Sequence, residues 1–203
     1  MSDILRNIRQ QATNLASIAE YLQSAGETQL SRSAALMRSF RRIAFVGVGG
    51  SRNAAQPAAI YLSRFGIDTR VLDASELLYY EKAPLNTALI LVSRSGRTAE
   101  MVLLAENLDR AGIPYIAVTN SADSPMAANA VVAGPVAGET DNGISIRTYT
   151  GAVLTLLYLS AAMVENLNIL QAEIAAMLPK LESRMAEWEM EDLRLKDSTF
   201  FVS

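Results

Sequence analysis

TALILVSRSGRTAE, residues 87–100, joins an apolar run to a short polar run that leads into a helical pattern. The apolar run has the length of one strand and no polar alternation, which is typical of a strand buried on both faces. The polar run carries glycine and hydroxyl residues, as strand-to-helix turns do. A strand, a turn and a helix in this order form the unit from which parallel sheets are built.

Similar runs occur along the chain, and together they predict a sheet. Five short β-rich runs are predicted as strands, at residues 42–47, 68–73, 87–93, 114–120 and 130–134. Helical patterns separate most of them, at residues 52–65, 98–111 and directly after Ser124. This alternation predicts an α/β fold, a three-layer sandwich with a five-stranded, mostly parallel sheet.

Helical patterns also flank the predicted sheet on both sides in the sequence. Two amphipathic helices are expected at 3–23 and 27–40, and an apolar helix at about 147–167. Its uncharged part, 148–164, is at the short edge of the roughly 17–25 residues that a membrane span needs, and it carries several hydroxyl groups. We therefore expect a buried or interfacial helix, followed by a charged helix at 171–195 that Pro179 disturbs.

These elements divide the chain into N-terminal helices at 1–40, an α/β domain at 41–168 and a linker helix at 169–197. The last residues, 198–203, end in TFFVS, which is similar to IAFVG at the end of 41–47. Both have polar residues, then Phe-Val or Phe-Phe-Val, then a small residue. We predict that 198–203 is the first strand of a second, similar domain.

The composition excludes several classes of function. The chain of 203 residues has a net charge of −3 and contains no cysteine and no histidine. Without a basic patch, a nucleic-acid partner is not expected. Without cysteine, the chain cannot form disulfides or thiolate metal sites, and without histidine it cannot form histidine metal sites or a Ser-His-Asp triad. We expect a cytoplasmic protein without metal or cofactor, whose apolar helix supports a homodimer or a higher homo-oligomer.

The loops that follow the strands are the candidate site, because ligands of open α/β sheets bind at the carboxyl ends of strands. Three of these loops are rich in glycine and hydroxyl groups: GVGGSRN at 47–53, SRSGRT at 93–98 and GPVAGETDNGISIRT at 134–148. Backbone N–H groups at a helix start form an anion site together with Ser and Thr hydroxyls. Phosphate is the anion that we expect.

The first loop, 47–53, allows two interpretations. It either contributes to a phosphate site or is only a tight turn in which Ser51 caps the next helix. It does not match a dinucleotide fingerprint, because Arg52 holds the place of the third glycine. It also lacks the Gly-Lys-Ser/Thr sequence of a Walker loop.

The second loop, 93–98, favours phosphate more strongly. Ser93, Ser95 and Thr98 provide more hydroxyl groups than a single N-cap requires. Gly96 between them allows the backbone to approach a ligand closely.

Arginines are concentrated in these loops or at the helix starts beyond them, at Arg52, Arg94, Arg97 and Arg147. A cation near a helix N-terminus is disfavoured by about 0.3–1 kcal/mol, and a bound anion would relieve this misfit. The alternative is that these side chains turn to solvent or pair with Glu100 or Asp141.

Two carboxylates are candidates for acid–base chemistry. Glu76 follows the second predicted strand, and Glu139 lies in a glycine-bearing loop at the carboxyl edge of the sheet. For Glu76 the alternative is a capping box, in which Ser75 or Asp73 caps the helix and Glu76 supports its first turn.

The order G-x-G-G-S, D-A-S-E and S-x-S-G-x-T, followed by a loop into a long apolar helix, resembles the sugar isomerase (SIS) domain over residues 40–165. This resemblance implies a flavodoxin-like sheet and a sugar phosphate as the ligand. It implies a phosphate site formed by Ser51, Ser93, Arg94, Ser95, Gly96 and Thr98. It also implies sugar contacts at Gly49, Gly50 and Ser145.

Within the family, the chain resembles the first domain of two-domain members, such as the isomerase half of glucosamine-6-phosphate synthase and the fructosamine phosphate deglycases. Those enzymes usually take their catalytic glutamate and histidine from the second domain or from another subunit. The one-domain sedoheptulose phosphate isomerases carry a histidine and a glutamate where this chain has Pro57 and Tyr61. This departure argues against a complete isomerase of that type.

Two functional hypotheses follow from the sequence. In the first, the chain is the N-terminal half of an aldose/ketose or amino-sugar isomerase or deglycase, which moves a proton between C1 and C2. In the second, it is a non-catalytic module that senses a phosphosugar. A nucleotide-binding oxidoreductase is a third class, which Arg52 and the missing third glycine oppose.

Overall fold

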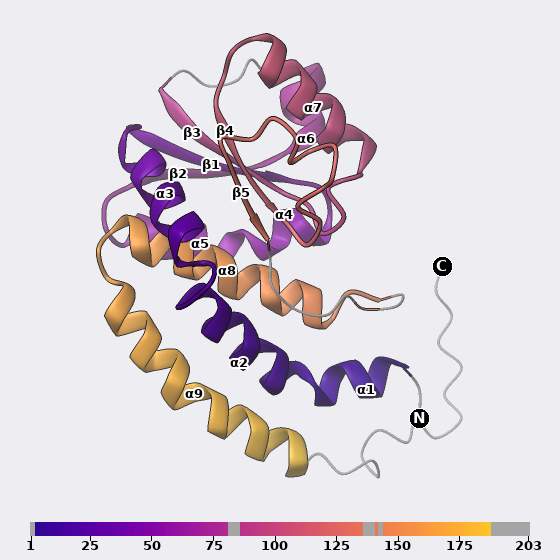
Figure 1. Ribbon diagram of the computed structural model, residues 1–203, viewed down its shortest axis with the longest axis vertical. Coiled ribbons are helices and arrows are strands. Elements are labelled where there is room, and N and C mark those ends of the chain that lie inside the picture. Colours follow the sequence, from indigo (N-terminus) through magenta and orange to yellow (C-terminus); the bar gives the residue numbers. More distant parts are fainter. Residues whose placement is uncertain (1–2, 81–85, 136–140, 142–143, 188–203) are drawn as a thin grey trace.

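The computed structural model describes residues 3–80, 86–135, 141 and 144–187. Within them, five parallel strands form one sheet in the order β2-β1-β3-β4-β5 (Figure 1). The strands are β1 (Arg42–Gly47), β2 (Asp68–Asp73), β3 (Thr87–Val92), β4 (Tyr115–Thr119) and β5 (Val132–Pro135). This sheet confirms the predicted α/β fold, and every described strand pair is parallel.

Helices cover both faces of the sheet, which gives the three layers. α6 (Ala74–Tyr79) and α7 (Ala99–Arg110) pack on one face. On the other face lie α2 (Gln11–Leu22), α3 (Glu27–Arg38), α5 (Gln56–Ser63) and α8 (Arg147–Met163). Successive residues of β1 alternate between the two layers: Ile43 and Phe45 join the larger core, while Ala44 and Val46 join the smaller one. Burial on both faces explains why the strands read as unbroken apolar runs.

The N-terminal helices belong to the larger core. α2 contributes Leu15, Ile18 and Leu22 to the buried cluster, and α2 and α3 both pack against α8. The predicted helix 3–23 is interrupted at Gln10, which separates α1 (Asp3–Arg9) from α2. The C-terminal helix α9 (Leu167–Glu187) packs on α2 and α8 along the outer side of this layer (Figure 1).

Two further helices, predicted between the strands, also differ from the structure. The helix expected at 52–65 is divided at Ala55 into α4 (Gly50–Ala54) and α5, because Pro57 has no N–H to continue the hydrogen-bond ladder. The short helix expected after Ser124 does not form, and that segment consists of turns. There the Met126 N–H donates to Gly96 O, in another part of the chain, at 3.2 Å.

The end of the chain is described only as far as residue 187. α9 continues through Pro179 without a break, which the sequence analysis did not predict. The predicted linker residues 188–197 and the predicted strand 198–203 lie outside the described residues.

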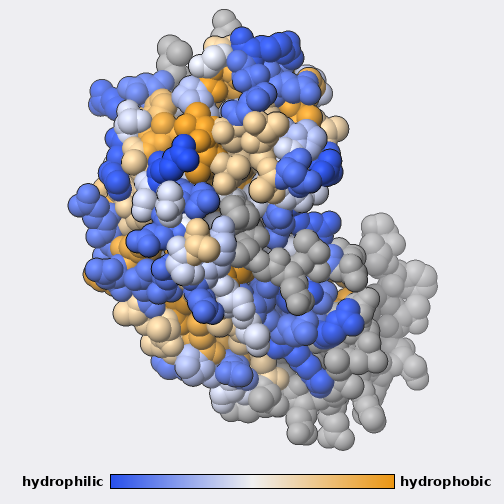
Figure 2. Space-filling model, viewed as in Figure 1, coloured by the Kyte–Doolittle hydropathy of each residue, from blue (hydrophilic) through white to orange (hydrophobic). Residues whose placement is uncertain are grey.

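Hydrophilic and hydrophobic residues are interspersed over the face of the molecule shown in Figure 2. Throughout the described ranges, each helix is too short or too polar to cross a lipid bilayer.

We predict that Tyr158 ties the N-terminal helices to the core. Its ring is fully buried in α8, and its hydroxyl accepts a hydrogen bond from Gln23 Nε2 at 3.1 Å. Tyr158→Phe removes only that hydrogen bond and should lower the free energy of unfolding by about 1 kcal/mol. Tyr158→Ala also leaves a cavity and should cost about 3–5 kcal/mol. Urea unfolding measures both values, and equal losses for the two variants would contradict this packing.

Candidate functional site

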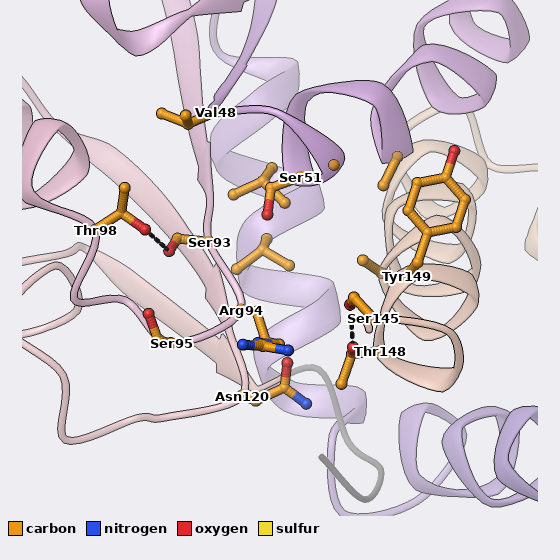
Figure 3. Close-up of a pocket in the computed structure, with 15 residues that line it drawn as sticks. Val48, Ser51, Ser93, Arg94, Ser95, Thr98, Asn120, Ser145, Thr148 and Tyr149 are labelled. Atoms are coloured by element: carbon orange, nitrogen blue, oxygen red, sulfur yellow. Dashed lines mark hydrogen bonds between the residues drawn. The ribbon is translucent and has the colours of Figure 1, made fainter. Parts of the chain in front are cut away.

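A cavity of about 320 Å³ opens at the carboxyl end of the sheet, between β1 and β3. The strand order reverses at this point, since the chain runs from β1 outward to β2 and then returns to β3 on the other side. Open α/β sheets bind ligands at such a switch point. The polar side chains that line the cavity are Ser51, Ser93, Arg94, Ser95, Thr98, Asn120, Ser145, Thr148 and Tyr149 (Figure 3).

One wall of the cavity is the loop 93–98, and its own hydrogen bonds hold it in place. Ser93 Oγ accepts from the Gly96 N–H at 3.2 Å and lies 3.3 Å from Thr98 Oγ1. Ser95 Oγ accepts from the Arg97 N–H at 3.2 Å. These bonds curl the loop so that its hydroxyl groups lie along the cavity, as Figure 3 shows.

The end of the neighbouring strand β4 and the residue after it hold the same loop by hydrogen bonds. The carbonyl oxygen of Arg94 accepts hydrogen bonds from the Asn120 N–H at 3.0 Å and from Thr119 Oγ1 at 3.1 Å. Arg94 therefore has a fixed backbone, while its side chain is exposed and reaches the cavity lining (Figure 3).

Gly96 is required at the turn of this loop for two reasons. Its φ of +60° lies in the left-handed region that favours glycine. A Cβ atom at this position would lie 2.1 Å from Ser124 Oγ and 2.5 Å from Ser124 Cβ. Gly96 is thus buried behind the wall and holds the loop close to the segment that follows β4.

The N-terminus of α7 completes this wall. The helix has 12 residues, its N-cap is Thr98, and no side chain provides a capping hydrogen bond. The first backbone N–H groups of an uncapped helix are ready to bind an anion. Together with the Arg94 guanidinium and three hydroxyl groups, they make this wall a suitable place for a phosphate group.

The opposite wall is the start of α8, and the buried carboxylate of Asp141 organises it. The Asp141 side chain has 0% exposure, and it accepts hydrogen bonds from the N–H groups of Ile146 (2.8 Å) and Thr148 (2.9 Å). It also accepts from Thr148 Oγ1 at 2.9 Å and from Arg147 Nε at 3.1 Å. Burial raises the pKa of Asp141, but these four hydrogen bonds outweigh it and leave the pKa below its ordinary value of 3.8.

Seven of the residues singled out from the sequence line the cavity: Gly50, Ser51, Ser93, Arg94, Ser95, Thr98 and Ser145. The fold brings them together from three loops that are far apart in the sequence. Gly49 lies next to the cavity lining in the chain, with φ +53°, and Gly96 lies behind it.

Three of the four arginines lie outside the lining. Arg147 is buried in the ion pair with Asp141, one of the alternatives weighed for it, so its guanidinium is not available to a ligand in the cavity. Arg97 lies 3.8 Å from Asp123, and both side chains are exposed. Arg52 Nε is buried and forms no hydrogen bond within the described residues.

Neither carboxylate candidate is found in the described cavity lining. Glu76 forms the capping box of α6, in which Glu76 Oε2 accepts from the Asp73 N–H at 3.1 Å and Asp73 Oδ1 accepts from the Ser75 N–H at 3.0 Å. Glu139 lies outside the described residues. In the described lining the ionisable groups are Arg94 and Tyr149, which can hold an anion but supply no carboxylate base.

Sequence reasoning missed three polar residues of the cavity. Asn120 directly follows β4, whose loop lacks the glycines that drew attention to the others. Thr148 and Tyr149 lie in the first turn of α8, which the sequence presents as the start of an apolar helix. Asn120 could have been found from the expected order of the strands, because a strand next to β3 would end at the same edge of the sheet as the loop 93–98. Among the described residues, no group of three or more acidic side chains could hold a metal ion.

Comparison with known proteins relates the chain to a family. The model of the SIS domain matches residues 36–164. The chain is 30% identical over 162 residues to the glutamine–fructose-6-phosphate aminotransferase (isomerizing) of Pyrobaculum aerophilum, covering 78% of this chain and 26% of that protein. It is 35% identical over 115 residues to the 3-hexulose-6-phosphate isomerase of Mycobacterium gastri, covering 55% of this chain and 56% of that protein.

Solved structures share the fold. The C-terminal domain of glucosamine-fructose-6-phosphate aminotransferase from Francisella tularensis has a TM-score of 0.74 at 20% identity, covering 91% of this chain and 54% of that one. The c3406 protein of E. coli CFT073, solved as a complex, has a TM-score of 0.68 at 18% identity, covering 87% and 99%. NanR of Vibrio vulnificus, complexed with ManNAc-6P, has a TM-score of 0.58 at 20% identity, covering 88% and 69%.

Gly96→Ala tests the close packing behind the loop. It combines a φ of +60° with a clash against Ser124, and we expect a loss of about 2–4 kcal/mol in the free energy of unfolding. Gly66→Ala is the matched control, because Gly66 has a φ of +74° but open space around its Cβ position. It should cost only about 1–2 kcal/mol. Thermal or urea unfolding gives both values, and equal costs would contradict the tight contact.

The buried carboxylate predicts a pH dependence of stability. Because the folded-state pKa of Asp141 is lowered, its ionised form stabilises the fold above the ordinary value of 3.8, and this contribution is lost as pH falls through the folded-state pKa. Asp141→Asn should lower the free energy of unfolding by about 3 kcal/mol at pH 7. The difference between wild type and variant should shrink in urea unfolding at pH 3. A difference that stays constant between these pH values would contradict this role.

Proposed function

The chain belongs to the SIS domain family, and on this basis we propose that its cavity binds the phosphate group of a sugar phosphate. The observation that carries the proposal is the wall formed by loop 93–98 and the uncapped start of α7, beside an exposed arginine. In this proposal Ser51, Ser93, Ser95 and Thr98 bind phosphate oxygens, together with the Arg94 guanidinium. Gly96 contributes by holding the loop in shape.

The sugar then extends away from that wall. We propose that Gly49, Gly50 and Ser145 lie along the sugar, with Ser145 on the opposite side of the cavity in Figure 3. The phosphate is remote from the reacting carbons in such a ligand, and its binding energy would position them. Arg52 and Arg97 remain candidates for a second anionic group.

The proposed reaction is isomerisation by proton transfer between C1 and C2, with the chain as the N-terminal half of an isomerase or a deglycase. The names of the Pyrobaculum and Mycobacterium relatives support this reaction class. The chain spans 26% of the first and 56% of the second, so the activity of the whole protein is itself part of the proposal. The base comes from outside the described lining, and Glu139 is a candidate for it.

A sensing module is the second candidate function. Two observations favour it: the described lining offers no carboxylate base, and the fold is shared with NanR, a protein solved with ManNAc-6P. Phosphosugar binding is common to both candidates. Turnover of a bound sugar phosphate would distinguish them.

We further propose that the protein is a cytoplasmic homo-oligomer. A groove of about 650 Å³ lies between α5, the end of α8 and α9, and its lining includes Tyr61, Phe65, Ile169 and Met177. Ile169 is 58% exposed and Phe65 45% exposed, and covering such apolar side chains would favour association.

A thermal-shift panel tests the phosphate site. Sugar phosphates such as fructose 6-phosphate should raise the melting temperature of the wild type, and unphosphorylated fructose should not. The double variant Ser95→Ala, Thr98→Ala should lose this shift because it removes two hydroxyl groups from the wall. Ser63→Ala is the control and should keep the shift, because Ser63 is exposed in α5 and, within the described contacts, its hydroxyl group bonds only to Ile60 O. A shift that survives in the double variant, or equal stabilisation by NAD, would overturn the proposal.

A further inference from the structure

A chain of hydrogen bonds, buried except at Gln10, connects the N-terminal helices to the start of α8. Gln10 Oε1 accepts from Arg147 Nη1 at 3.0 Å, and Asn14 Nδ2 donates to Arg147 O at 3.4 Å. Arg147 Nε in turn donates to Asp141 Oδ1 at 3.1 Å. The carboxylate at the centre of this chain is fully buried, so its two oxygens are held in fixed directions.

The chain continues from Asp141 to the cavity through two hydroxyl groups. Thr148 Oγ1 donates to Asp141 Oδ2 at 2.9 Å, and it also forms a hydrogen bond with Ser145 Oγ. A hydroxyl group has one proton, and Thr148 donates it to the Asp141 carboxylate, which can only accept. In the bond with Ser145, therefore, Thr148 is the acceptor and Ser145 is the donor.

As a consequence, the two walls of the cavity offer different hydrogen-bonding groups to a ligand. The Ser145 proton points back to Thr148, so Ser145 presents only lone pairs to a ligand. A lone pair accepts a hydrogen bond from a sugar hydroxyl group but offers nothing to a phosphate oxyanion. The wall of loop 93–98, with Arg94 and the N-terminus of α7, offers donors instead.

We propose that Asp141 is a positioning residue that orients the ligand. Through Thr148 it makes Ser145 an acceptor for a sugar hydroxyl group. The phosphate group then binds at the opposite wall, around Arg94. This inference rests on the proposed binding of a sugar phosphate in the cavity. It deepens that proposal, since it assigns the two ends of the ligand to opposite walls. It also predicts that Asp141 affects sugar phosphates and inorganic phosphate differently.

The test compares two ligands by isothermal titration calorimetry. Asp141→Ala removes the acceptor of the Thr148 proton, so Thr148 can donate to Ser145 and the Ser145 hydroxyl group is free to turn its own proton toward the cavity. The affinity for fructose 6-phosphate should fall about fivefold or more, the worth of one hydrogen bond. The affinity for inorganic phosphate should change less than about twofold. A variant that was merely less well folded would lose both affinities together.

Two further variants keep the result interpretable. Asp68→Ala is the matched control, because Asp68 is exposed at the start of β2, where it pairs with Arg42, and both affinities should stay at wild-type values. If Asp141→Ala does not fold by circular dichroism, Thr148→Val breaks the same connection while leaving the carboxylate in place. The same split between the two ligands is expected.

The possible outcomes separate the inference from the proposed function. Equal losses for the two ligands, or an unchanged affinity for fructose 6-phosphate in a folded variant, would overturn the role of Asp141 alone. Wild-type protein that binds neither ligand would overturn the proposed function itself, and the inference with it.

Discussion

The parallel pairing of β1 with β3 is the constraint on which the site depends. Its register aligns Gly47 with Val92, so the loops that leave the two strands start side by side at one edge of the sheet. Because β2 lies on the far side of β1, no connection passes between these loops, and a cavity remains there. The apolar runs that form the sheet thus also decide where polar groups can gather.

Two buried contacts turn this cavity into a site with two different walls. At one wall Gly96 packs against Ser124 where the loop curls, and the start of α7 has no side-chain cap. At the other wall Asp141 binds the first turn of α8 and fixes the hydroxyl group of Thr148. The first wall is rich in donors and positive charge, and the second offers acceptors. A ligand with an anionic end and hydroxyl groups fits this arrangement.

The sequence predicts the sheet well, because each strand is buried on both faces and therefore reads as a short apolar run. It also predicts Ser93 and its loop from local composition, since glycine and hydroxyl residues cluster there. It offers the pairing of Arg147 with Asp141 only as an alternative, and it does not predict the contact of Arg147 with Gln10, which is 137 residues away in the sequence. Asn120 was missed as well, since its place in the cavity follows from the order of strands rather than from its neighbours.

The central claim is that a phosphate group binds at the loop 93–98 and the start of α7. The most direct measurement is a titration of the isotope-labelled protein with fructose 6-phosphate, followed by the backbone amide chemical shifts. The account predicts the largest shifts at residues 93–101, with smaller ones at Ser145 and Thr148. Shifts confined to another surface, such as the groove between α5 and α9, would contradict it, as would no shifts at all.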